Sequence, residues 1–282
     1  MNPIRPLLSV VCLALLVISC GSEETKNAKT VFVFEQNFND AQNGNLTISE
    51  IKREWKEATF LWGIKDRIGY YLGMKGHTPN ITGESNKQLE VVIPAHTAGP
   101  IPGMQWSTKF KRSYTELTLE YDVKFDSSFN FAKGGKLPGL AGGMANTGGK
   151  KPNGEDGWSA RMMFWEGGKL CFWLYHQNQP GEFGDSLFFK KEGTYFAFER
   201  GKWYTIKHHL KINSENKADG VIEGYINDTL YASRTNLKWT NTEKLSIDQL
   251  IFSVFLGGEG KEYESNKNEK IYFDNFKVTQ GQ

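Results

Sequence analysis

Cysteine is scarce in this chain, and an excess of charge of one sign is absent. Only three of the 282 residues are cysteines, at positions 12, 20 and 171, so no disulfide framework is expected. Lys and Arg number 34 against 32 Asp and Glu, which gives a net charge of +2. This balance gives no support to nucleic-acid binding through overall charge. A hydrophobic core must stabilise the fold, and an acidic ligand would need a local cluster of positive charge.

The first twenty residues are predicted to be a leader. The apolar run 7–18 is too short to span a bilayer comfortably and is typical of a signal-peptide core. It ends in Val17-Ile18-Ser19-Cys20, which resembles a bacterial lipobox, while an ordinary signal peptide cleaved elsewhere is the alternative. The resemblance implies a signal peptide over 1–19, lipidation of Cys20 and a location at the outer membrane or cell surface. Residues 20–30 would form a polar tether and residues 31–282 the folded domain.

Internal repeats are also absent, and helix signals are few. Thr47 and Glu50 have the spacing of a capping box at the start of a short helix, with Trp55 on its apolar side. Most other apolar segments alternate or lie between Gly, Asn, Asp and Pro clusters, which favours strands. We expect strands near 32–38, 89–94, 114–125, 157–165, 169–177, 203–212, 220–228, 250–258 and 270–278. The pattern predicts an all-β fold, an antiparallel jelly-roll sandwich with one or two short helices.

Two of these strands carry aromatic and polar side chains on one face. In 157–165, Arg161, Met163 and Trp165 share a face, and in 169–177, Trp173 and Tyr175 share one. Aromatic rings cover the apolar faces of sugars, and Tyr and Arg bind hydroxyls and carboxylates. We therefore interpret this face as a concave groove for a sugar polymer. The alternative is a two-sided core in which Arg161 pairs with an acid.

The segment KGGKLPGLAGG, residues 133–143, places Lys136 among glycines. Glycines permit tight folding and close approach of another molecule. We interpret the segment as a loop, which either is simply solvated or presents the Lys136 ammonium to an anion.

Three motifs together resemble polysaccharide lyase family 14, which contains lyases of alginate and glucuronan. They are GGKLPGL at 134–140, Ser-Ala-Arg at 159–161 and WLYHQNQPGEFGD at 173–185. The resemblance covers roughly residues 34–278. It implies a β-jelly roll and a β-elimination reaction, in which a base removes the C5 proton beside a uronate carboxylate and the C4 oxygen leaves.

The resemblance also implies roles for single residues. Lys136 matches the essential lysine of the family motif, and Ser159 and Arg161 match a serine and an arginine on the neighbouring strand. Arg161 would neutralise the carboxylate, because a guanidinium fork suits a planar carboxylate. Tyr175 matches the second of two family tyrosines. We thus expect Lys136, Arg161 and Tyr175 to be catalytic, and Ser159 and Trp173 to bind substrate.

The position of the first family tyrosine is occupied by Trp173 in this chain. An indole donates a hydrogen bond but does not exchange a proton usefully. If the reaction needs two phenols, activity is in doubt. If one phenol serves as base and then acid, Tyr175 suffices and Trp173 becomes a stacking platform, which is the interpretation we favour.

Two further residues are candidates for substrate binding. Gln105, in GMQW, is either a substrate ligand or a strand-edge amide. His176 is also included, although in a regular strand it would point away from Tyr175 and favour a structural role.

No metal or cofactor is predicted. His208 and His209 are adjacent on a strand and face opposite ways, so they are poor joint ligands. Glu35, Asp274 and Asn275 offer oxygens for a structural Ca²⁺, but such clusters commonly arise without metal.

Three function classes remain to be compared. The expected one is an alginate lyase, with another uronate polymer such as glucuronan as the alternative substrate. The second is a non-catalytic glycan-binding lipoprotein, which Trp173 favours. A glycoside hydrolase is disfavoured because no pair of carboxylates lies on the groove strands. The expected partner is an acidic polysaccharide, with no nucleic acid and with membrane contact only through the lipid; we expect a monomer.

Overall fold

The alternating residues of segment 116–125 form the most regular strand of the protein, β6 (Glu116–Phe125). Every odd-numbered side chain from Leu117 to Phe125 is buried, and every even-numbered one is partly exposed. Alternation of this kind places one face of a strand against a core and the other toward solvent. β6 lies between β13 and β17 in the larger of two sheets.

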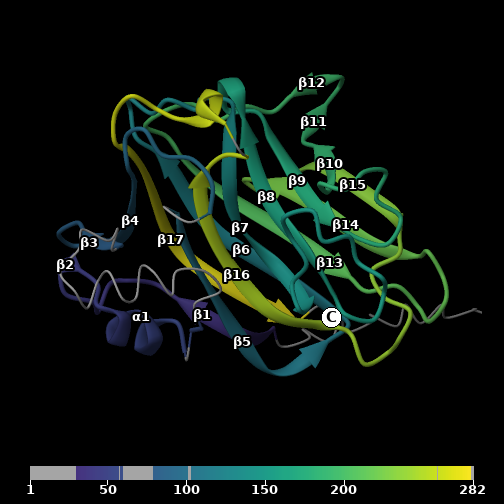
Figure 1. The fold of residues 1–282 in the computed structure, drawn as a ribbon. Helices are drawn as coiled ribbons and strands as arrows, with labels where there is room; N and C mark the ends of the chain where they lie inside the picture. Colours follow the sequence, from purple (N-terminus) through teal and green to yellow (C-terminus); the bar gives the residue numbers. More distant parts are fainter. Residues whose placement is uncertain (1–29, 57, 60–78, 101–102, 259, 281–282) are drawn as a thin grey trace, which may run out of the picture.

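The computed structural model describes residues 30–56, 58–59, 79–100, 103–258 and 260–280. Apart from one two-stranded hairpin, its described strands form two open antiparallel sheets that pack as layers (Figure 1). The larger sheet runs β15-β14-β13-β6-β17-β4-β3-β2 with β1 beside β17, and the smaller runs β10-β9-β8-β7-β16-β5. The expected antiparallel jelly-roll sandwich is confirmed.

The remaining elements have the following bounds. In the larger sheet they are β1 (Val31–Gln36), β2 (Gly44–Asn45), β3 (Asn80–Thr82), β4 (Gln88–Ile93), β13 (Trp203–Lys211), β14 (Gly220–Ile226), β15 (Thr229–Leu237) and β17 (Glu269–Gln280). In the smaller sheet they are β5 (Met104–Tyr114), β7 (Gly134–Gly143), β8 (Gly157–Trp165), β9 (Leu170–Tyr175), β10 (Asp185–Phe188) and β16 (Ile247–Leu256). Outside both sheets are α1 (Ile48–Glu54), η1 (Glu166–Gly168), η2 (Lys261–Tyr263) and the hairpin β11 (Lys190–Lys191) with β12 (Thr194–Tyr195).

The core between the sheets is rich in aromatic rings. Trp106 of β5 stacks on Phe252 of β16 at 4.0 Å, and Trp55 at the end of α1 contacts both rings edge-on. The predicted capping box is present, because Thr47 and Glu50 bond reciprocally at the start of α1. Large rings of this kind bury much apolar surface and prefer edge or offset contacts, so Trp55 anchors the end of α1 to the core.

The interpretation of 133–143 as a loop is wrong, because most of this segment is the central strand β7. Its pairing shifts between Leu137 and Gly139, which is a bulge containing Pro138. Proline lacks an N–H and is tolerated inside a sheet at such bulges. A Cβ on Gly139 would lie 2.1 Å from the Ala160 carbonyl oxygen. The glycine at 139 therefore serves close packing of neighbouring strands.

Cys171 is buried and free, as expected for a small apolar side chain. The expected signal peptide, Cys20 and nearly all of the tether lie outside the described residues. Among the described residues, none of the helices has the length and apolar character needed to cross a membrane.

Candidate active site

Pairing in the smaller sheet brings the three predicted catalytic residues onto one face. Lys136 on β7 pairs with Met163 on β8, and Arg161 on β8 pairs with Gly139. On the next strand, Trp173 pairs with Arg161 and Tyr175 pairs with Ser159. Paired residues of neighbouring strands point to the same face. Lys136, Arg161 and Tyr175 thus lie diagonally across three adjacent strands.

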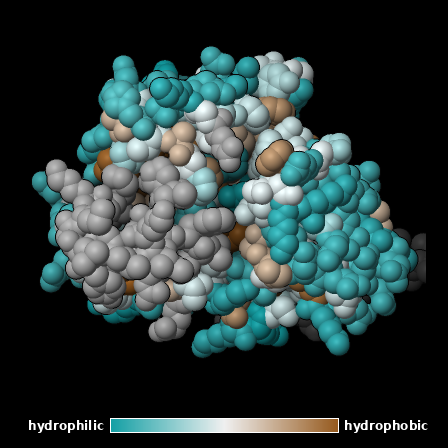
Figure 2. Space-filling model, in the orientation of Figure 1, coloured by the Kyte–Doolittle hydropathy of each residue, from teal (hydrophilic) through white to brown (hydrophobic). Residues whose placement is uncertain are grey.

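We call this the groove face. The opposite face of the same strands supplies Leu140, Met162 and Phe172 to the main core. The surface is hollowed near its middle, in front of the central strands of the sheet (Figure 2). Lys136, at 7% exposure, and Arg161, at 5%, are nearly withdrawn from water.

Among the residues that the structure describes, Arg161 does not pair with an acid, contrary to the alternative of a two-sided core. Within the described chain, neither Arg161 nor Lys136 takes part in an ion pair. One guanidinium nitrogen, Nη1, donates to Ser253 Oγ at 3.2 Å, while the buried Nε has no partner among the described atoms. A buried charge without a counter-ion is costly. These two cations therefore form a site that an anion would stabilise.

Burial changes the acidity of both cations. It lowers the pKa of Lys136 from 10.5 to about 7, and the neighbouring Arg161 charge adds to this effect. Burial also lowers the pKa of Arg161 to about 10, while the nearby Tyr175 favours its charged form. The Lys136 ammonium lies 2.8 Å from Met163 Sδ and 4.7 Å from the centre of the Trp173 ring. Neither neighbour carries a negative charge, so desolvation dominates.

A short chain of hydrogen bonds holds Arg161 in place. Ser253 on β16 accepts from the guanidinium and donates to Gln105 Oε1 at 2.9 Å. The Gln105 amide nitrogen donates to the Pro100 carbonyl at 3.1 Å. Gln105 is thus on the groove face, but its polar atoms are already bonded, and it orients Arg161 through Ser253. The sequence analysis did not identify Ser253. The available indication was that a small polar residue interrupts the apolar run LIFSVFL.

The loop between β7 and β8 covers the Tyr175 end of the site. The Gly149 N–H donates to the Tyr175 hydroxyl oxygen at 3.2 Å. Ser159 Oγ donates to the Asn146 carbonyl at 2.6 Å, which anchors the same loop. In the structure, therefore, Ser159 holds the loop, and the loop amide bonds the Tyr175 oxygen.

His176 lies on the other side of the sheet from Tyr175. Its Nε2 is 3.0 Å from Asp185 Oδ2, and its ring contacts Trp239 edge-on. Arg234 on β15 binds the same carboxylate, so the cluster ties the two sheets together. This position gives His176 a structural contact rather than a place on the groove face.

Within the described residues, no three His, Cys, Asp or Glu side chains are grouped as metal ligands would be. His208 is buried against the Phe172 ring, whereas His209 binds Glu116 on the opposite face. Asn275 Nδ2 donates to Asp122, so this amide is already bonded within the protein.

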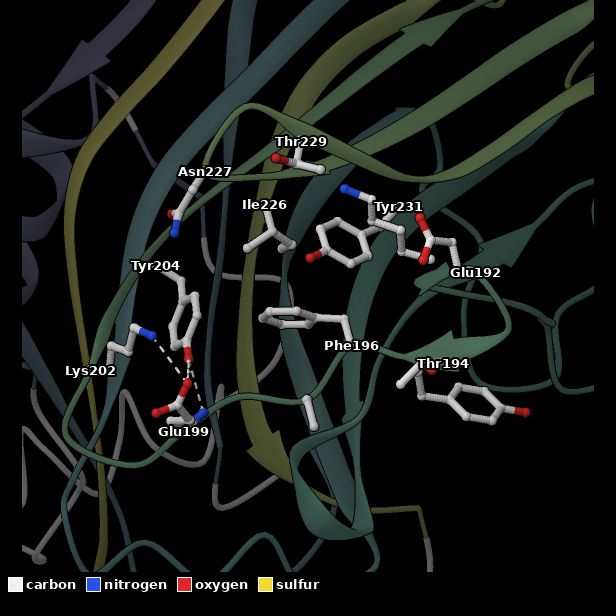
Figure 3. A pocket seen from close by; sticks show the side chains of 13 residues that line it. Glu192, Thr194, Phe196, Glu199, Lys202, Tyr204, Ile226, Asn227, Thr229 and Tyr231 are labelled. Carbon is white, nitrogen blue, oxygen red and sulfur yellow. Dashed lines mark hydrogen bonds and ion pairs between the residues drawn. The ribbon is translucent and has the colours of Figure 1, made fainter.

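A separate hollow of about 640 Å³ lies beside β12 to β15. Phe196 lies between Tyr204 and Tyr231, and Lys202 pairs with Glu199 at its rim (Figure 3). None of the predicted site residues lines this hollow.

Comparison with known proteins identifies the relatives of this chain. The family model described as polysaccharide lyase 14 matches residues 82–276. No curated protein matches the sequence.

Solved structures match it over most of its length. The alginate lyase Aly36B is 24% identical over 88% of this chain and 96% of its own, with a TM-score of 0.71. The PL-14 alginate lyase from Aplysia kurodai is 22% identical over 89% of this chain and 100% of its own, with a TM-score of 0.72. An endo-β-1,4-glucuronan lyase from Trichoderma reesei is 12% identical over 89% and 96%, with a TM-score of 0.53. These similarities show the shared fold.

Proposed function

The chain belongs to polysaccharide lyase family 14 and is a lyase of uronate polymers, and on this premise we propose that it cleaves alginate by β-elimination at the groove face. The proposed catalytic groups are Arg161, Lys136 and Tyr175. Ser159, Trp173 and Gln105 support them by anchoring the covering loop, offering a stacking surface and positioning Arg161.

The reaction requires stabilisation of a carboxylate and movement of one proton. Loss of the C5 proton places a second negative charge on a group that is already anionic, so cations at the carboxylate lower the barrier. Arg161 and protonated Lys136 neutralise this charge. The deprotonated oxygen of Tyr175 takes the C5 proton, the C4–O4 bond breaks as the C4=C5 bond forms, and the phenol then protonates O4.

One observation carries this proposal: two nearly buried cations without a carboxylate partner in the described chain lie beside a phenol on one sheet face. The desolvation that lowers the pKa of Lys136 is relieved when a uronate carboxylate binds. The Gly149 N–H donates to the Tyr175 oxygen, and Tyr175 lies close enough to Arg161 to favour its charged form. A neutral sugar would leave both cations unpaired.

Alginate is proposed as the polymer because the matched structures favour it. Variants of Aly36B were solved in complex with alginate trisaccharide and tetrasaccharide, and their fold covers 88% of this chain. The glucuronan lyase shares the fold at lower similarity, with a TM-score of 0.53. Glucuronan is therefore the alternative substrate.

The test is ultraviolet absorbance of the purified protein with alginate, polymannuronate, polyguluronate and glucuronan. Elimination creates a C=C bond conjugated to a carboxylate, which absorbs, whereas hydrolysis does not. We expect absorbance to rise with an alginate fraction, and Lys136→Met to lower the rate by about 10²-fold or more. Lys133→Met is the matched control, since Lys133 is a nearby exposed lysine paired with Glu262. A wild-type rate in K136M would contradict the mechanism.

A glycan-binding protein without catalysis is the second candidate, and Trp173 favours it. The indole supplies a stacking surface beside Lys136 where the family has a phenol. Binding of alginate without any rise in absorbance would support this candidate over the lyase mechanism.

A further inference from the structure

We infer that the groove extends beyond the cleavage site along a row of aromatic side chains to Tyr195, where it binds the distal part of a long uronate chain. This inference rests on the proposed function, because the ligand is the same anionic polymer. We call these residues the aromatic row: Trp173, Trp165, Phe188 and Tyr195.

The aromatic row starts at the catalytic lysine and is continuous. The Trp173 ring lies 4.7 Å from Lys136 Nζ, and its centre is 6.0 Å from that of Trp165. Trp165 and Phe188 are 6.1 Å apart, and Phe188 and Tyr195 are 5.2 Å apart. The first three rings are partly exposed, and Tyr195 is 42% exposed. Rings in a core would be covered, whereas these remain accessible to a ligand.

Strand register places the first three rings of the aromatic row on the groove face. Cys171 of β9 pairs with Met163 on one side and with Phe188 of β10 on the other. Phe188 therefore points to the same face as Met163, and Met163 pairs with Lys136. β10, β11 and β12 follow beyond β9 toward the upper right (Figure 1). The row thus leads from the sheet centre to its outer edge.

Positive charge marks the far end of the aromatic row. Lys190 Nζ lies 4.2 Å from the centre of the Tyr195 ring, and Lys169 Nζ lies 5.5 Å from it. Within the described part of the chain, neither lysine forms an ion pair, and the nearby Glu166 and Glu192 bind neither of them. Both lysines are exposed, and each ammonium lies over the Tyr195 ring. They are available to carboxylates of a polymer.

The hollow of about 640 Å³ shown in Figure 3 adjoins the far end of the row, because Tyr195 is one of its lining residues. Its volume lies within the range that small-molecule sites occupy. The hollow therefore offers space for sugar units beyond the last ring of the row.

A long uronate chain fits these features better than a neutral glycan or a short oligosaccharide. Rings stack on the apolar faces of sugars, while the lysines select for carboxylates. A second contact on the same polymer raises affinity through effective concentration, and a short chain held at Lys136 cannot reach it. The expected signature is dependence of affinity on chain length.

The experiment compares wild type with the double variant Y195A/K190Q on long alginate and on alginate trisaccharide. Both residues are exposed, so folding should be preserved, and an unchanged melting temperature checks this. We expect KM for long alginate to rise about five- to tenfold with unchanged kcat, because loss of ring stacking and charge is worth about 1 kcal/mol or slightly more. KM for the trisaccharide should stay at the wild-type value.

Lys124→Gln is the matched control. Lys124 also lies over aromatic rings, 4.8 Å from Trp203 and 4.6 Å from Tyr272, but on the larger sheet. It should change neither KM. Affinity electrophoresis in alginate gels measures binding without catalysis. Weaker retardation of Y195A/K190Q than of the wild type would support polymer binding by the aromatic row, even if the wild type has no lyase activity. Equal retardation of both proteins, or an equal change with trisaccharide and polymer, would overturn the inference.

Discussion

Lys136 is the residue whose environment most constrains the chemistry. It extends from a central strand into a site with Arg161 and Trp173 as neighbours, and burial lowers its pKa to about 7. An ammonium with this pKa is partly neutral at neutral pH. Its protonation state therefore decides whether the free enzyme offers a carboxylate one cation, Arg161, or two.

The first prediction concerns the pH dependence of catalysis. If protonated Lys136 binds the carboxylate, kcat/KM should fall as the pH rises through about 7, because this parameter reports groups of the free enzyme. The corresponding fall in kcat should lie at higher pH, since a bound carboxylate favours the ammonium. Initial rates with alginate between about pH 5 and 10 measure both. A kcat/KM that does not fall between about pH 7 and 10 would contradict a role for the Lys136 ammonium.

Tyr175 and Trp173 provide the second prediction. With a single phenol acting as base and acid, Tyr175→Phe should lower kcat by about 10²- to 10⁴-fold, which is the usual contribution of proton transfer by a side chain. Trp173→Phe keeps a stacking ring and should change kcat by less than about tenfold. Single-turnover rates with alginate separate the two effects. A large gain in W173Y would instead indicate that two phenols are needed.

From the sequence, only those site residues that lie within a recognisable motif were predictable. Arg161 and Tyr175 lie on the groove face, as the alternation in their strands indicated, whereas Lys136, which was expected in a loop, joins them from β7. Ser253 was missed because hydrogen bonds between distant strands are not encoded in local spacing. His176 faces away from Tyr175, as the alternation of its strand indicated.

At the scale of elements, β7 is the main departure from expectation. Gly and Pro normally indicate turns, yet this segment crosses the sheet centre with a bulge at Pro138. Close packing of neighbouring backbones requires glycine there, as at Gly139. Strands β5 and β15 were also missed, because long polar stretches such as STKFKRSY hide their alternation.

The third prediction concerns His208 on β13. Burial lowers its pKa from 6.5 to about 3, and both ring nitrogens lack partners among the described atoms. The unfolded chain therefore binds more protons between these values, so stability falls as the pH drops from about 6.5 toward 3. The loss should be about 1.4 kcal/mol for each pH unit in that window.

His208→Leu should remove this loss. The free energy of unfolding of the variant, relative to that of the wild type, should therefore increase as the pH falls below 6.5. Urea unfolding followed by circular dichroism measures both free energies. His209→Gln is the control, because this neighbour lies on the opposite face against Glu116, and it should keep the acid sensitivity of the wild type. Parallel stability curves for wild type and H208L across the acid range would contradict the assignment.

At the scale of the whole molecule, we propose that the lyase domain is tethered to the outer membrane or cell surface through Cys20. The apolar run 7–18 and the small residues before Cys20 support this. In a bacterial host, the wild type should partition into the membrane fraction, while Cys20→Ser should be released as a soluble lyase of equal specific activity. Immunoblotting of the membrane and soluble fractions measures this partitioning. Equal partitioning of both proteins would contradict lipidation.

The sequence by itself determined the all-β architecture, the capped helix and the identity of the cationic and phenolic residues, because alternation, capping and short motifs are local properties of a chain. The tertiary structure alone decided that Lys136 stands on a bulged central strand and that Ser253 and Gln105 hold Arg161. It also decided that aromatic rings from β8, β9, β10 and β12 form one row. These features depend on which strands become neighbours, and pairing between segments far apart in the chain sets the burial and the charge that each side chain experiences.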